Sequence, residues 1–286
     1  MNERKQRGSG WSIKAALYVY KTLGYRFFYY LLYPITFFYF IVAKNARDGL
    51  KVYYAHLGVP FTNRRYYEHL RMFAVCMTDR FVAKVNPENY SFEYDNIEIP
   101  TKILESGTVL VYSHFGGWAA SSSGAHVHNR INIVMQEAML DGIKKIENDL
   151  ERESNIHVID LNQGTIAVSV QIANALLKEE VVAIMADRAS NEKAEIEVLF
   201  LDEKARFNKN PFQVAYKVDK PILAYFIIWI GIQRYKVEYI RIDMDKNKPE
   251  EQAIEEALAI YVKKLEEIVK AYPNQWFNLY NFWEKK

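Results

Sequence analysis

Hydrophobic residues recur at helical spacing through the first third of the chain. Residues 11–43 carry a long apolar periodicity, which predicts one or two helices with Pro34 marking a kink or a boundary. The helical pattern continues over residues 46–57 and 63–86. It ends at the polar stretch 86–89, where asparagine and proline favour a turn. We therefore expect a helical first third followed by a different architecture.

Short apolar runs alternate with helical segments through the rest of the chain. The strand candidates span residues 108–113, 131–135, 156–160, 181–186, 196–200, 221–230 and 235–242. The helical candidates span 118–125, 140–151, 165–177 and 211–217, and an amphipathic helix over 250–271 closes the pattern. This alternation predicts an α/β fold with a mixed, mainly parallel central sheet flanked by helices, preceded by a helical hydrophobic N-terminal region.

A basic and aromatic segment precedes the α/β pattern. Residues 27–43 form an uncharged run of 17 residues, rich in Phe and Tyr and bounded by Arg26 and Lys44. The run is at the lower limit of length for spanning a bilayer, and Pro34 interrupts it. Up to residue 51 the basic residues are Arg4, Lys5, Arg7, Lys14, Lys21, Arg26, Lys44, Arg47 and Lys51, against Glu3 and Asp48.

This charge asymmetry changes how the N-terminal helices are interpreted. Basic residues attract anionic lipid, and aromatic residues suit a membrane interface. We therefore predict that residues 1–50 form a membrane-associating segment, either lying on the surface or acting as a short anchor, and that residues 51–286 form the α/β domain. The basic flanks favour the cytoplasmic side. The alternative is a buried hydrophobic helix pair within the globule.

Composition narrows the function classes. A single cysteine, Cys76, excludes an internal disulfide framework and fits a reducing compartment. A net charge of +2 gives no argument for a nucleic-acid partner. The sequence contains no GxGxxG, Walker A or GxSxG motif, which weakens the familiar nucleotide-binding and hydrolase interpretations.

The leading candidate for chemistry is a histidine at the end of a predicted strand. The apolar run 109–112 is followed by Ser113 and His114, and then by Gly116 and Gly117. Such a strand delivers an imidazole to a sheet edge, where the glycines allow a close approach to the backbone. Because histidine titrates near neutral pH, His114 is a candidate general base. The alternative is a structural histidine.

A second strand candidate, 181–186, ends in Asp187 and Arg188. The carboxyl ends of parallel strands meet at one edge of a sheet, so both side chains are expected to face the region that His114 enters. The alternative makes Asp187 a turn cap and Arg188 a solvated neighbour.

Two further groups of polar residues carry weaker signals. Arg206 lies before a predicted helix start, where it could meet a phosphate, although solvation at the surface is the commoner fate of such a charge. His126 and His128 form an HxH pair without a recognisable third ligand, so no metal site is predicted.

Five blocks in the chain resemble a known superfamily. The blocks are GSGW at 8–11 followed by a hydrophobic helix, SHFGGW at 113–118, MADR at 185–188, ARFNKNPFQVAYKVDKPIL at 205–223, and QWFNLYNFW at 275–283. Their identity and order are similar to those of the lysophospholipid acyltransferase superfamily, in the bacterial branch that includes the lipid A biosynthesis acyltransferases and its sub-branch of predicted acyltransferases.

The resemblance assigns roles to the first block. The family motif is a histidine, four residues and then an acid; the histidine serves as base and the acid orients and charges the imidazole. In this chain His114 matches the base, whereas Ala119 occupies the position of the acid. Asp187 and Glu137 are the expected replacement acids, because both follow strands that should approach the same edge.

The resemblance implies a membrane-associated acyltransferase of lipid biosynthesis. It would move a fatty acyl group from acyl carrier protein or acyl-CoA to a lipid-like hydroxyl or amine acceptor, at the cytoplasmic face of the inner membrane and without a metal or other cofactor. The predicted catalytic residues are His114 and Asp187. The predicted substrate-binding residues are Phe115, Gly116, Gly117, Trp118, Glu137, Arg188 and Arg206. The alternative, motivated by Ala119, is a non-catalytic member that binds acyl chains or acyl carriers.

Overall fold

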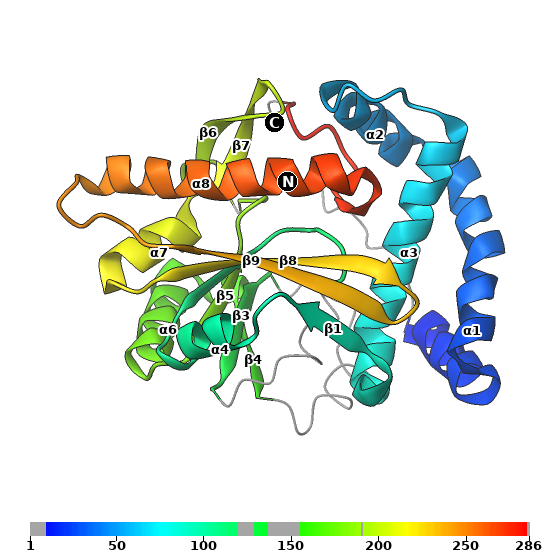
Figure 1. Ribbon diagram of the computed structural model, residues 1–286, viewed down its shortest axis with the longest axis horizontal. Coiled ribbons are helices and arrows are strands. Elements are labelled where there is room, and N and C mark those ends of the chain that lie inside the picture. Colours follow the sequence, from blue (N-terminus) through cyan, green and yellow to red (C-terminus); the bar gives the residue numbers. More distant parts are fainter. Residues whose placement is uncertain (1–9, 119–128, 137–154, 190, 285–286) are drawn as a thin grey trace.

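A seven-stranded sheet forms the centre of the protein in the computed structural model (Figure 1), which describes residues 10–118, 129–136, 155–189 and 191–284. The helices are α1 (Gly10–Val42), α2 (Lys44–His56), α3 (Asn63–Val85), α4 (Glu98–Glu105), α6 (Thr165–Leu177), α7 (Asn210–Val218) and α8 (Glu250–Ala271). The strands are β1 (Ser91–Tyr94), β2 (Val109–Tyr112), β3 (Ile131–Met135), β4 (Ile156–Asp160), β5 (Val181–Met185), β6 (Glu195–Phe200), β7 (Glu203–Asn208), β8 (Ile222–Gly231) and β9 (Arg234–Ile242).

The strand order of the central sheet is β1-β9-β8-β2-β5-β3-β4. Strands β8, β2, β5, β3 and β4 are parallel to one another, β9 is antiparallel to β8, and β1 is parallel to β9. Strands β6 and β7 form a separate antiparallel hairpin. The mixed, mainly parallel sheet confirms the predicted fold class.

Helices cover both faces of this sheet. Val109 and Val111 of β2 belong to the main hydrophobic core, together with buried residues of α6, α7 and α8. Leu110, between them, packs on the opposite face with Ile103 and Leu104 of α4. The four residues from Val181 to Ile184 in β5 are all buried, as expected for an apolar strand inside a parallel sheet.

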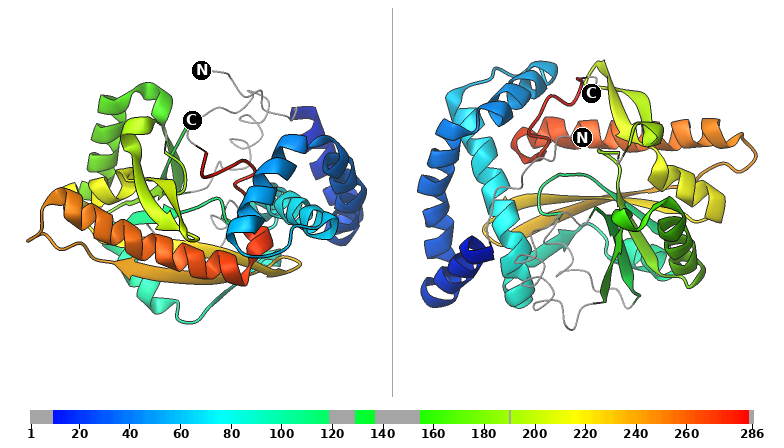
Figure 2. Two further views of the ribbon diagram at one scale, coloured as in Figure 1. Left: turned by 90° about the horizontal axis from the view of Figure 1, so that it is seen from above. Right: turned by 180° about the vertical axis from the view of Figure 1, so that it is seen from behind.

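Three helices gather at one side of the sheet (Figures 1 and 2). Helix α1 packs along α3, and its helical dihedral angles are interrupted at Gly24, with φ of 77°. The helical run continues through Pro34 to Val42, so the interruption of α1 lies ten residues before the proline that was expected to mark it.

Much of the second half of α1 is exposed. The exposed large apolar residues there are Phe27, Tyr30, Tyr33, Ile35, Phe37, Phe38, Tyr39, Ile41 and Val42. Among the described helices, none alone has the length and apolar character needed to cross a bilayer. The bent pair Tyr18–Val42 and Lys44–His56, which meet at 88°, satisfies both criteria together.

The predicted elements match most of those observed. The pattern did not predict β1, α4 or β7, which are short or carry alternating charges. The helical candidates 118–125 and 140–151 lie, apart from Trp118, outside the described residues. The division of the chain into a membrane-associating segment (residues 1–50) and an α/β domain (residues 51–286) stays a prediction.

Candidate active site

The site begins where two neighbouring parallel strands end. Tyr112, the last residue of β2, is paired in register with Met185, the last residue of β5. The next amide, Ala186 N, donates to Tyr112 O at 2.9 Å, which keeps the two chains side by side past the strands. His114 and Asp187 therefore leave the sheet at the same edge, each two residues beyond its strand.

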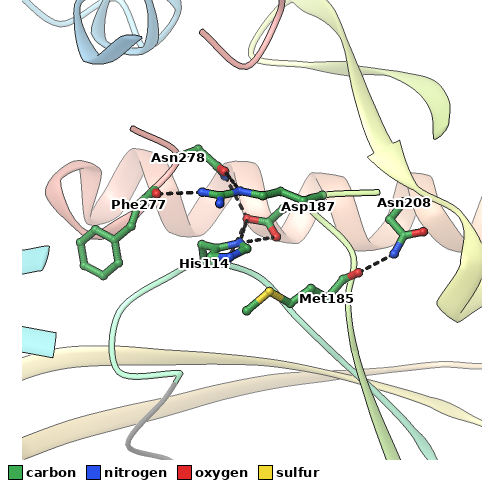
Figure 3. Close-up of polar contacts among 7 residues, drawn as sticks. His114, Met185, Asp187, Asn208, Phe277 and Asn278 are labelled. Atoms are coloured by element: carbon green, nitrogen blue, oxygen red, sulfur yellow. Dashed lines mark hydrogen bonds and ion pairs between the residues drawn. The ribbon is translucent and has the colours of Figure 1, made fainter. Parts of the chain in front are cut away.

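The imidazole and the backbone amide of His114 both hydrogen-bond to Asp187 (Figure 3). The imidazole Nδ1 lies 3.0 Å from Asp187 Oδ1, and the backbone N of His114 donates to Asp187 Oδ2 at 2.9 Å. A carboxylate can only accept, so Nδ1 carries a proton, and in the neutral imidazole Nε2 then keeps its lone pair. The side chain of His114 is 20% exposed whereas that of Asp187 is fully buried. The arrangement presents a basic nitrogen supported from behind by a buried negative charge.

Asp187 remains ionised despite its burial. Desolvation alone raises the pKa of a buried carboxyl group. The charge and hydrogen bonds of His114, together with the charge of Arg188, outweigh that effect and lower the pKa of Asp187 to about 2. The carboxylate thus carries a full negative charge at neutral pH.

A residue near the end of the chain completes the site. Asn278 is buried, and its Nδ2 donates to Asp187 Oδ2 at 2.9 Å while its Oδ1 accepts from Arg188 Nε at 2.6 Å. Its neighbour Phe277 donates from its backbone N to His114 O at 2.7 Å and accepts at its carbonyl from Arg188 Nη2 at 3.0 Å. Figure 3 shows Phe277 and Asn278 lying beside the His114–Asp187 pair.

Sequence reasoning missed Asn278. The only signal was a polar amide inside the aromatic string at 275–283, and nothing local in that string indicates a contact with a strand end 91 residues earlier.

The two glycines after His114 allow neighbouring protein atoms to approach the backbone. Gly116 has φ of 52°, and a Cβ there would lie 1.9 Å from the carbonyl oxygen of Ile227. A Cβ on Gly117 would lie 2.2 Å from the ring of Tyr235. The close approach predicted at these glycines is therefore made by β8 and β9, and their contact with substrate stays a prediction.

All four backbone amides from His114 to Gly117 are hydrogen-bonded within the protein. His114 N donates to Asp187, Phe115 N to Ser113 O, Gly116 N to Gln275 O and Gly117 N to Ile227 O, at 2.7 to 2.9 Å. A loop held at every amide has little freedom to change shape.

The comparison with protein families supplies the context for this geometry. The family model of the bacterial lipid A biosynthesis acyltransferases matches residues 68–285. The chain belongs to this family. Membership of this family supports acyltransferase activity in general. A comparison with curated proteins found no match.

The spacer of the family motif is partly buried in this acyltransferase. Phe115 is buried in the main core. The ring of Trp118 meets that of His114 edge-on, with centroids 5.7 Å apart, and stacks with Tyr112 at 5.9 Å. Trp118 therefore lies against the partly exposed imidazole of His114, and its contact with substrate stays a prediction.

The remaining predicted site residues are placed elsewhere or lie outside the described residues. Arg206 is on β7, where its guanidinium lies 3.2 Å from Glu195 and 3.6 Å from Glu197 of β6. Ala119, Glu137, His126 and His128 lie outside the described residues. Within the described ranges, no group of three His, Cys, Asp or Glu side chains could hold a metal ion.

Proposed function

We propose that this family member transfers a fatty acyl group from an acyl-carrier-protein or coenzyme A thioester to a lipid-like hydroxyl or amine, with His114 as general base. The observation that carries the proposal is the 3.0 Å contact between His114 Nδ1 and Asp187 Oδ1. Asp187 would do the work of the acid that the family motif places at position 119, where this chain has alanine.

The reaction would proceed by general base catalysis. Nε2 of His114 removes the proton from the acceptor hydroxyl or amine as its oxygen or nitrogen attacks the thioester carbonyl carbon. Asp187 stabilises the imidazolium that forms and holds the proton on Nδ1. When the tetrahedral intermediate collapses, the carbon–sulfur bond breaks and the leaving thiolate takes the proton back from Nε2. The acyl group ends on the acceptor, and the base is regenerated.

The negative charge on the carbonyl oxygen must be stabilised by groups outside the loop 114–117. Each amide of that loop already donates to an acceptor of the protein. An oxyanion needs donors that are free to point at it. We therefore propose that the hydrogen-bond donors to the oxyanion lie on another segment of the protein or on the bound substrates.

We also propose that the protein acts at the cytoplasmic face of the inner membrane. The exposed residues Phe27, Tyr30 and Phe38 of α1 would lie in the headgroup region, and nearby Lys and Arg residues would contact anionic lipid. Tyr side chains are typical of this interface because the ring is apolar and the hydroxyl polar, whereas Phe side chains add apolar area that is buried at the boundary with the acyl chains.

The test of the proposed reaction compares wild type with His114→Ala. Each protein is incubated with acyl-CoA and acyl-carrier-protein thioesters of several chain lengths, together with phospholipid and glycolipid vesicles, and acylated lipid is measured by mass spectrometry. We expect His114→Ala to lose about three orders of magnitude or more in kcat. His157→Ala, which removes a histidine of β4, serves as the matched control and should retain activity.

Equal inactivity of wild type and His114→Ala on every donor and acceptor would overturn the catalytic proposal. Retained binding of the thioesters under that outcome would favour the binding member suggested by Ala119. Binding to vesicles is measured separately, so that the membrane proposal can fail on its own.

A further inference from the structure

We propose that Asn278 is a positioning residue that holds Arg188 apart from Asp187, so that the charge of Asp187 is directed to His114. The inference rests on the proposed function of His114 and Asp187, and it assigns a role to the C-terminal segment 275–278.

The amide of Asn278 lies between the two charged side chains. Its Nδ2 donates to Asp187 Oδ2 at 2.9 Å, and its Oδ1 accepts from Arg188 Nε at 2.6 Å. Asp187 and Asn278 are both buried, with 0% and 1% of their surfaces exposed, so water is kept from their contact. A carboxamide is a neutral side-chain group that can donate to a carboxylate at one end and accept from a guanidinium at the other.

Without the amide, Arg188 and Asp187 would be expected to pair directly. They are adjacent in the chain, and a guanidinium forms two parallel hydrogen bonds with a carboxylate. Arg188 would then compete with His114 for the carboxylate of Asp187, and the hydrogen bond between Asp187 and His114 Nδ1 would weaken. In the structure, Arg188 is instead held by Asn278, by the carbonyl of Phe277 at 3.0 Å and over the ring of Tyr280 at 5.1 Å.

The segment that carries Asn278 is anchored independently of its side chain. His69 Nε2 lies 3.0 Å from the carbonyl of Trp276, and the Gln275 side chain bonds to both the N and the O of Trp229. Trp276 is fully buried. Because these contacts hold the backbone, a substitution at Asn278 changes the polar network while the segment keeps its place.

The experiment is a double-mutant cycle on Asn278→Leu, Arg188→Leu and the double variant, with wild type as reference. The first readout is the proton NMR signal of His114 Nδ1–H, whose downfield position reports the strength of the bond to Asp187. We expect Asn278→Leu to move this signal upfield or to lose it through exchange. The double variant should restore the signal, because the competing cation is gone.

The second readout is steady-state acyl transfer from the best thioester of the wild-type assay. Asn278→Leu should lower kcat by about tenfold or more and leave KM nearly unchanged, because the lost contact acts on the base and not on the substrate. Asn281→Ala is the matched control from the same segment: its side chain accepts from Trp283 N, and both readouts should stay at their wild-type values.

A merely structural role gives a different pattern. It predicts that the double variant is at least as impaired in the NMR signal as Asn278→Leu, and that outcome, or an unchanged signal in a folded Asn278→Leu protein, would overturn the inference. If Asn278→Leu does not fold, Asn278→Ala removes the same amide without adding bulk and carries the same expectation. The NMR readout needs no turnover, so an inactive wild type with a restored signal in the double variant would refute the proposed function alone.

Discussion

Asp187 and Asp79 are two buried carboxylates whose pKa values are shifted in opposite directions. Each accepts hydrogen bonds from three donor groups: Asp187 from His114 N, His114 Nδ1 and Asn278, and Asp79 from the hydroxyls of Tyr25, Tyr90 and Tyr235. Burial raises the pKa of Asp79 to about 6, whereas the pKa of Asp187 is lowered to about 2.

The difference lies in the charge of the partners. Tyrosine hydroxyls lower the pKa of Asp79 only in part, because neutral donors do not compensate for the loss of water around a charge. Asp187 faces a group that becomes cationic and lies beside Arg188, so its ionised form is favoured despite full burial. Hydrogen-bond number alone therefore does not decide whether a buried acid keeps its charge.

The two carboxylates also belong to different parts of the molecule. Tyr25 is on α1, Asp79 on α3 and Tyr235 on β9, so the Asp79 cluster ties the N-terminal helices to the sheet. The ring of Tyr235 in turn lies against Gly117 of the active-site loop. The Asp79 cluster thus reaches, through the ring of Tyr235, the loop that carries His114, at a glycine three residues further along the chain.

The largest expected effect comes from making Asp187 neutral. Asp187→Asn keeps the shape, but its amide can donate to Nδ1 and so favours the tautomer that carries the proton on Nε2, where no base remains. We expect kcat for acyl transfer to fall by about three to four orders of magnitude.

Asp79→Asn, which makes the same chemical change in the other cluster, is the control. It should change kcat at pH 7 by less than about tenfold, because the hydrogen bonds of Asp79 go to Tyr25, Tyr90 and Tyr235 and to neither His114 nor Asp187. If the activity of Asp187→Asn stays within tenfold of that of wild type, Asp187 has no part in the reaction.

The second effect is on stability as a function of pH. The pKa of Asp79 is raised on folding, so its contribution to stability is full below pH 4 and is lost as the pH rises through about 6. The change from 3.8 to about 6 corresponds to about 3 kcal/mol in the free energy of unfolding. Asp187, with a lowered pKa, has the opposite sign and loses its contribution only as the pH falls from about 4 toward 2.

Urea unfolding of wild type and Asp79→Asn at pH 4, 5, 6 and 7 measures the pH-dependent contribution of Asp79 to the free energy of unfolding. The stability of the variant relative to wild type should rise across that range, because an amide does not ionise. Asp243→Asn, which neutralises an exposed carboxylate, should show no such trend. A flat difference for Asp79→Asn would show that the tyrosine hydroxyls fully compensate its charge.

The smallest effect concerns the point where the two clusters meet. Gly117→Ala places a methyl group 2.2 to 2.8 Å from atoms of the Tyr235 ring. We expect a loss of about 2 kcal/mol in the free energy of unfolding, because the ring is fixed by its bond to Asp79 and cannot yield freely. Gly231→Ala, whose new methyl would meet only ordinary contacts at 3.9 Å, is the control and should cost less.

The residues at the two strand ends could be predicted from the sequence because each is marked by a pattern within a few neighbouring residues. An apolar run ending in an ionisable residue predicted both His114 and Asp187, and the parallel sheet explains why their side chains meet. Asn278 and Asp79 could not be predicted in this way. Their partners are 91 and up to 156 residues distant in the chain, and a lone amide or acid in an apolar stretch has no periodicity that names its partner.

The fully bonded loop from His114 to Gly117 has a consequence for how the site would meet its substrate. Its four amide hydrogens are shielded as in a strand, so slow deuterium exchange is expected although the loop is neither helix nor strand. If His114 acts as the proposed base, its conformational entropy is lost when the chain folds and not when an acyl donor binds. Under that proposal, affinity for the donor would depend on the substrate and on the surfaces around the loop, because Asp187 already holds the imidazole in place before the donor binds.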